Sequence, residues 1–233
     1  MNNLIRAEFY RLKHSSHLIM WVIGTCILGV AISFMSDSEE VTRQEFVTAS
    51  PMGMVISLMS AGIVIGRHYQ NRTAFYEIMG GVSAHNIILS RICVYTPLIL
   101  GFYFVPVSVI LMIFDGGMDT VMFLLMFLII FIRLLIFTIC MCLTFKTGEG
   151  AIIPYIRFVG ELILTMLFTV EDIRKFFPVL NWMPIFQIFS LSVKIDNMLI
   201  IKIIIGCVAE CAVMYIIAYI SHRKKWLIKL LLT

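Results

Sequence analysis

Charged residues are scarce in this sequence. Asp, Glu, Lys and Arg make up 14% of its 233 residues, whereas 61% are hydrophobic and the mean hydropathy is +0.99. Soluble globular domains carry about 25% charged residues, so this composition excludes that class and favours a polytopic membrane protein. We therefore expect one transmembrane domain over residues 1–233 and no separate soluble domain.

Motifs that bind nucleotides or catalytic metals are also absent. The sequence contains neither a GxxxxGK[ST] phosphate loop nor an HExxH zinc motif. Its five histidines lie near the ends of apolar runs without metal-ligand spacing, and its six cysteines all lie inside such runs, where they can neither staple an exposed loop nor form a zinc ligand set. We therefore expect no catalytic, cofactor-binding or metal-binding residue in this chain.

Apolar runs near the length of roughly 20 residues that a helix needs to cross a bilayer recur along the chain. Six of them cover residues 18–35, 51–66, 92–114, 120–145, 151–170 and 197–220. Ser50-Pro51 has the pattern of an N-cap and a first helical residue, so the second span is predicted to begin at Pro51. Pro97, Gly101 and Pro106 predict a bend in the third span. The predicted fold is all-α, with six transmembrane helices.

Two segments outside these runs mix apolar and polar residues. Residues 1–17 set apolar residues against Arg6, Arg11 and Lys13, which predicts an elbow helix in the membrane interface with its apolar face in lipid. The apolar stretches of residues 171–196 are too short and too broken to cross a bilayer. They predict a re-entrant segment on the outer side before the sixth span.

Basic residues are distributed unequally between the two sides of this predicted bundle. Eleven lysines and arginines lie in residues 1–17, 67–91, 146–150 and 221–233, against four in residues 36–50, 115–119 and 171–196. The positive-inside rule therefore predicts that both termini are cytoplasmic. The net charge of +4 reflects this sidedness and gives no reason to expect nucleic-acid binding.

Residues 67–91 form a polar, punctuated segment between the second and third runs. Apolar residues recur at helical spacing up to Met79, and Gly80-Gly81 then supplies the left-handed conformation that closes a helix. Ser83 can cap a new helix that begins at Ala84. The pattern predicts a helix, a tight turn and a second helix, and leaves open whether this element is a contact for a partner or a solvated linker.

Charged residues within the apolar runs are a further feature. Arg157 and Glu161 are four residues apart on one predicted helix, so their side chains can pair. Arg133 on the preceding span can join them, and Glu210 with Lys202 can form another polar contact. An isolated charge in a bilayer is costly and usually faces a partner or a watery path. Arg133, Arg157 and Glu161 are therefore candidates for a translocation path or gate, with a structural contact between helices as the alternative.

This layout resembles the membrane subunit of type-2 ABC exporters, and in particular the short permeases of bacitracin and lantibiotic immunity and of peptide-toxin export. The stretch that carries the resemblance is IGRHYQNRTAFYEIMGGVSAHNIILSR, residues 65–91, which has a polar exit from a span, a helix with an acid, a glycine turn and Ser-x-x-x-Ile. The short KTGEG turn at residues 146–150 and the broken segment before the sixth span also match the family layout.

The resemblance implies a transport component that is not an enzyme by itself. Two copies of a separate ABC subunit would bind ATP and Mg and hydrolyse ATP, and a second permease, identical or different, would complete the dimer in the plasma membrane. The substrate would be an amphipathic peptide or lipid-like molecule. The residues implied to contact the ATPase are Arg72, Phe75, Tyr76, Glu77, Met79, Gly80 and Gly81 of the coupling helix, with Lys146 and Glu149 in a smaller second contact.

Two other classes of function stay open at this stage. A secondary transporter or channel would work without ATP if the intramembrane charges formed an ion relay, although six spans without an evident inverted repeat argue mildly against it. A membrane enzyme would need polar catalytic groups that converge at one depth, and Arg157 with Glu161 is the one candidate pair.

Overall fold

The computed structural model describes residues 2–13, 43–70, 77, 80–114, 117–145, 152–167 and 178–230. All regular structure in these residues is helical, and they contain no strand. The elements are α1 (Asn2–Lys13), α3 (Arg43–Gln70), α5 (Ala84–Ile99), the π-helix η1 (Leu100–Phe104), α6 (Val105–Phe114), α7 (Met118–Phe145), α8 (Ile152–Leu167), the 3-10 helix η3 (Pro178–Trp182), α10 (Pro184–Val193) and α11 (Asn197–Leu230). The all-α prediction is confirmed for this part of the chain.

Three helices in the described residues are long and apolar enough to cross a membrane: Ala84–Ile113, Met118–Phe145 and Asn197–His222. They match the predicted third, fourth and sixth spans. The predicted second span contains a shorter apolar helix, Ile56–Gly66. The predicted fifth span contains α8, whose 16 residues extend for only about 24 Å. The predicted first span, residues 18–35, lies outside the described residues, so the count of six remains a prediction.

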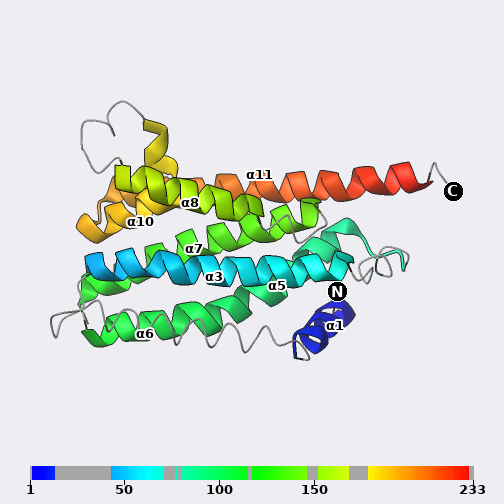
Figure 1. The fold of residues 1–233 in the computed structure, drawn as a ribbon, viewed down its shortest axis with the longest axis horizontal. Coiled ribbons are helices and arrows are strands. Elements are labelled where there is room, and N and C mark those ends of the chain that lie inside the picture. The colour runs from blue at the N-terminus through cyan, green and yellow to red at the C-terminus, as the bar shows by residue number, and fades with distance from the viewer. Residues whose placement is uncertain are drawn as a thin grey trace.

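The long helices lie side by side along the long axis of the molecule (Figure 1). The end of α3, the start of α5 and α1 lie at one end of this bundle, together with the C-terminal end of α11. The starts of α3 and α7 lie at the other end with α10. The two termini are therefore at the same end, as the predicted topology requires, while the side of the membrane that each end faces stays a prediction.

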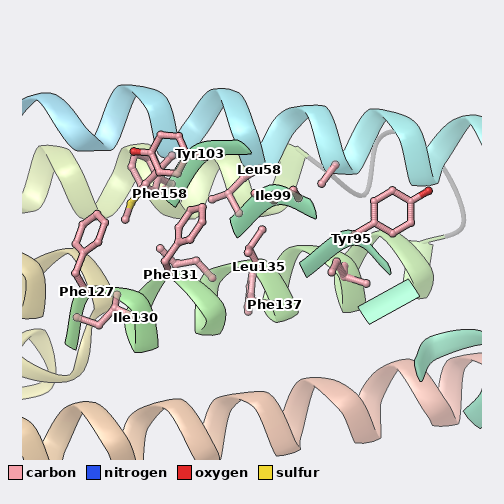
Figure 2. Close-up of a cluster of buried hydrophobic side chains, with 14 of the residues drawn as sticks. Leu58, Tyr95, Ile99, Tyr103, Phe127, Ile130, Phe131, Leu135, Phe137 and Phe158 are labelled. Carbon is pink, nitrogen blue, oxygen red and sulfur yellow. The ribbon is translucent and has the colours of Figure 1, made fainter. Parts of the chain in front are cut away.

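Helix α7 lies at the centre of the bundle. It packs against α3, α5, α8, α10 and α11. In the most apolar 18-residue stretch of α7, 72% is buried inside the protein, compared with 22% in Ala84–Ile113 and 17% in Asn197–His222. Phe127, Phe131 and Leu135 of α7 belong to the same buried core as Tyr103 of η1 and Leu58 of α3 (Figure 2), and the rings of Phe131 and Tyr103 are in contact, with centroids 5.1 Å apart. The exposed apolar side chains of α11 and α6 are thus available for lipid.

The start of α3 corrects one prediction. Pro51 does not begin the helix, because α3 is already helical from Arg43. The first turns are held by packing: Phe46 and Val47 are fully buried, and the Phe46 ring meets the edges of Phe123 and Phe127 with centroids 5.9 Å and 5.6 Å apart. Burial of the Phe46 ring stabilises the helix before Pro51. This packing outweighs the local preference of Ser50-Pro51 for the start of a helix.

Helix α1 also differs from its prediction. Leu12 is only 1% exposed and Ile5 packs against the core, so part of the apolar face of α1 covers α5 and is not free for lipid. Phe9 and Tyr10 are exposed. The helix is consequently a docked element whose outer surface alone can meet the membrane interface.

The segment before α11, predicted to be re-entrant, contains one short helix. Helix α10 has 10 residues, about 15 Å, which is too short to cross a bilayer. Pro184, Ile185, Phe186, Gln187, Ile188 and Leu191 of α10 are all buried. Residues 171–177 lie outside the described part of the chain, and the location of α10 relative to a membrane stays a prediction.

Candidate functional site

Four charged residues, which we call the charge cluster, join α7, α8 and α11 inside the bundle: Arg133, Arg157, Glu161 and Glu210. Arg157 Nε donates to Glu161 Oε1 at 2.7 Å on the same helix, which confirms the predicted pair. Its two terminal nitrogens bind the Glu210 carboxylate, Nη2 at 3.2 Å from Oε2. Arg133 Nε donates to that carboxylate from the other side, at 2.5 Å from Oε2. Glu210 is therefore shared by two guanidinium groups.

The charge cluster also holds the short segment η3–α10. Arg133 Nη1 donates to Gln187 Oε1 at 3.2 Å, and Arg133 Nη2 donates to the Trp182 carbonyl at 3.1 Å. The Ile185 amide donates to Glu161 Oε2 at 3.2 Å. Since α10 begins at Pro184, this carboxylate satisfies one of the amides that the first turn of a helix leaves unpaired. Three hydrogen bonds thus tie the predicted re-entrant segment to the charged residues.

The cluster balances its charge internally, with two guanidinium groups against two carboxylates. Glu161 and Arg133 are buried, while the side chains of Arg157 and Glu210 are 22% and 17% exposed. Arg157 also lies over the ring of Phe137, with 4.4 Å from Cζ to the ring centroid. A neutral, hydrogen-bonded group of this kind is tolerated in an apolar environment, whereas removal of one member leaves a charge that costs several kcal/mol.

A pocket of about 420 Å³ opens beside the cluster. Arg133, Arg157, Gly160 and Glu161 contribute to its lining, and the remaining residues are Ile156, Leu164, Val179, Trp182 and Met183. Ile156 and Val179 are more than half exposed. The pocket therefore has charged residues on one side and apolar residues around its mouth, which suits an amphipathic ligand.

A second buried group of charges lies next to the predicted coupling loop, on α1, α5 and the loop itself. Arg91 on α5 is 1% exposed and pairs with Glu8 of α1. Arg91 Nη2 also lies 3.2 Å and 3.0 Å from Oε1 and Oε2 of Glu77. The hydroxyl of Tyr95 donates to Glu8 Oε2 at 3.2 Å. We call Glu8, Glu77, Arg91 and Tyr95 the loop clamp, because they connect α1, the loop and α5.

The turn after Glu77 has the geometry that its sequence predicts. The Val82 amide donates to the Glu77 carbonyl at 3.2 Å, and Gly81 has φ +73°. This bond across five residues, with positive φ at Gly81, is the pattern of a Schellman motif after the helical residue Glu77. Ser83 is the N-cap of α5, and its hydroxyl accepts from the Asn86 amide at 3.3 Å. The predicted turn and cap are confirmed, with positive φ at Gly81 and not at Gly80.

The predicted site residues fall into three groups: those that the structure brings together, those that it places in the loop, and those outside the described residues. It brings Arg133, Arg157 and Glu161 together, and it adds Glu210 and Gln187, which the sequence reasoning did not include in the site. Glu77 is 9% exposed at its side chain and bound to Arg91, so its carboxylate positions the loop instead of facing outward. Gly80 and Gly81 are exposed. The other predicted contact residues, Arg72, Phe75, Tyr76, Met79, Lys146 and Glu149, lie outside the described residues.

Some of these pairings had a signal in the sequence. Glu210 is an acid inside an apolar run, so a search for its partner among the basic residues of other spans would have suggested Arg133 or Arg157. Glu8 and Arg91 are further apart, and each lies in a segment that already mixes charged with apolar residues, so neither stands out in its segment.

Comparison with protein-family models, with curated proteins and with solved structures finds no match to this chain.

Proposed function

We propose that this chain is the membrane permease of an ATP-driven type-2 ABC exporter, which moves an amphipathic peptide or lipid-like substrate while separate subunits hydrolyse ATP. The observation that carries the proposal is the loop clamp with the turn it holds. Glu77 is helical, residues 80–83 form the turn, and α5 begins at Ala84. This segment lies at the end of the bundle that also holds α1 and the C-terminal end of α11 (Figure 1).

A segment that transmits force from a partner must be attached to the bundle at fixed points. The turn meets this requirement at two points. Arg91 forms ion pairs with both Glu77 and Glu8, and the Ser83 hydroxyl caps the first turn of α5. A solvated linker would need neither the buried ion pairs nor the Schellman motif. The exposed surface at Gly80 and Gly81 is then free for an ATP-binding subunit.

The charge cluster, on α7, α8 and α11, supports a role in transport. Its residues hold η3–α10 beside an open pocket with charged and apolar walls. In the proposed exporter it acts as a gate. The hydrogen bonds that Arg133 donates to Trp182 and Gln187, and the one that Glu161 accepts from Ile185, are exchanged for contacts with a substrate, and this releases the short segment. The same cluster favours a second candidate, an ATP-independent transporter in which these charges form an ion relay.

Reconstitution of the purified chain in lipid vesicles distinguishes the two candidates. The chain is combined with a candidate ABC ATP-binding subunit from the same organism, and uptake of a fluorescent amphipathic cationic peptide is measured with and without ATP. We expect uptake that needs both subunits and ATP, together with peptide-stimulated ATP hydrolysis. Uptake by the chain alone, driven by a proton or sodium gradient, would refute the exporter hypothesis and support the secondary transporter.

A further inference from the structure

A five-residue deviation from α-helical geometry lies in the middle of one long apolar segment. The α-helical bonding of Ala84–Ile99 changes to a π-helix at Leu100–Phe104 and returns at Val105. Pro97 precedes the π-helix and Pro106 follows it. The Val105 amide donates to the Leu100 carbonyl, five residues back, as a π-helix requires. One segment thus consists of two α-helical halves, α5 and α6, joined by a π-helical link.

Several backbone and side-chain groups around this link lack the bonds of a regular helix. Proline has no N–H, so Pro97 and Pro106 each remove one hydrogen bond to the preceding turn. The hydroxyl of Thr96, directly before Pro97, is buried without a hydrogen-bond partner. Ser108 donates instead to the Phe104 carbonyl at 2.7 Å, a bond that tends to bend helices. Around Gly101, an added Cβ would meet no atom within 4 Å. The link therefore lacks several helical hydrogen bonds and has open space on its exposed side at Gly101, while Tyr103 anchors its other side in the core.

The first half of the segment is firmly attached to α1 and to the loop. Arg91 on α5 pairs with Glu8 and Glu77, and Tyr95, one turn further along, donates to Glu8. Leu12 of α1 is buried in the same region. Any displacement of α5 must carry α1 and the Glu77 turn with it, because their separation would expose buried charges without partners.

We propose that α1, the Glu77–Ser83 turn and α5 form one rigid arm that tilts against the bundle about a hinge from Pro97 to Pro106. Kinks in helices occur at prolines and π-bulges, and this segment has two prolines flanking a π-helix. Because α5 also packs on α7 and α11, the motion is a tilt on the bundle surface and not a detachment. The arm is a mechanical property of the fold and does not depend on the proposed function, although in an exporter it would carry movement of the loop to α6.

Spin-label distance distributions in the full-length chain, reconstituted in lipid vesicles, test the hinge. The native cysteines are replaced except where a label is wanted, and three pairs are compared. Cys93 and Val109, both exposed and 16 positions apart, report across the hinge. Ile201 and Ile217, also exposed and 16 positions apart on the uninterrupted α11, are the matched control. Tyr10 and Cys93 report within the arm. All sites other than Cys93 are changed to cysteine.

We expect a broader distribution for the pair across the hinge than for the control pair on α11, because a populated tilt gives more than one distance. The combined change Pro97→Ala with Pro106→Ala should narrow the distribution across the hinge to that of the control. The distribution within the arm should be narrow in the parent chain and should broaden in Glu8→Gln.

Three results would each overturn the proposal. A distribution across the hinge as narrow as that of the control would mean that the segment is one stiff helix. If the two alanine substitutions left the breadth of the distribution across the hinge unchanged, the flexibility would not arise from Pro97 and Pro106. A distribution within the arm as broad as that across the hinge would mean that α1 and α5 do not move together.

Discussion

Arg133 occupies the space that the missing side chain of Gly206 leaves on α11. A Cβ at position 206 would lie 2.9 Å from Arg133 Nη1 and 3.4 Å from Cζ. The close approach of α7 and α11 at this level allows Arg133 to reach Glu210, one turn further along α11. Gly206 is thus a requirement of the charge cluster, and its role is invisible from the sequence.

We predict that Gly206→Ala lowers stability by about 1–3 kcal/mol, the usual cost of an overpacked site. The methyl group must displace the guanidinium, and the bond from Nη1 to Gln187 is the first to be lost. The measurement is thermal unfolding of the purified chain in detergent. Gly160→Ala is the matched control, because a Cβ there meets no atom within 4 Å. Equal melting temperatures for the two variants would show that Arg133 moves aside at no cost.

Glu210 should be more sensitive to substitution than Glu161. Glu210→Gln leaves two guanidinium groups without their shared carboxylate, whereas after Glu161→Gln the Arg157 side chain still has Glu210. We expect a loss of about 3 kcal/mol or more for Glu210→Gln, in the range for breaking a buried ion pair, and a smaller loss for Glu161→Gln. Unfolding of both variants is compared with Lys194→Gln, which removes an exposed charge. The reverse order would mean that Glu161 is the main partner of Arg157.

The loop clamp can be probed by removal of a single oxygen. Tyr95→Phe deletes the hydroxyl that donates to Glu8, and its loss should lower stability by about 0.5–1.5 kcal/mol. Tyr155→Phe, at a tyrosine that is 42% exposed, is the control and should have little effect. Chemical unfolding in detergent measures both. If the two substitutions had the same effect, the bond from Tyr95 to Glu8 would contribute nothing.

The turn requires positive φ at one glycine only. Gly81→Val should weaken the Schellman motif, because a β-branched residue resists φ near +73°, whereas Gly81→Asn should retain it and Gly80→Val should be milder. Hydrogen exchange at the Val82 amide, which donates to the Glu77 carbonyl, measures the motif directly. We expect faster exchange in Gly81→Val alone, and similar exchange in all three variants would refute the assignment.

Sidedness can be tested at exposed positions. Gly80→Cys and Asp119→Cys lie at opposite ends of the bundle and are both exposed, whereas Glu77 is too buried for efficient labelling. In a cysteine-free background, an impermeant maleimide added to intact cells should label position 119 and not position 80. Labelling of position 80 would invert the predicted topology and exclude the contact with a cytoplasmic ATPase.

Local features of this fold could be predicted from the sequence because a few adjacent residues determine them. The turn at Gly81, the Ser83 cap, the irregular helix near Pro97 and the pair of Arg157 with Glu161 all depend on residues within one or two turns. The ion pairs of Glu210 with Arg133 and of Arg91 with Glu8 depend on how helices rotate and pack. The sequence pattern of a single helix does not determine that rotation. The start of α3 was missed for a related reason, since Phe46 is fixed by rings of α7.

The central place of α7 also has a consequence for biogenesis. Arg133 is synthesised 77 residues before Glu210, so in the proposed topology α7 enters the bilayer before the partner of Arg133 on α11 is made. A central arginine opposes insertion by about 2.5–3.5 kcal/mol on translocon scales, and only surrounding apolar residues can offset this cost at that moment. This explains why α7, the helix that the finished protein shields most from lipid, is the most apolar of the three long helices. The apolar residues of α7 thus favour its insertion during synthesis. Once α11 is made, Gly206 leaves space for the Arg133 side chain and Glu210 pairs with it, so that α7 packs against α11.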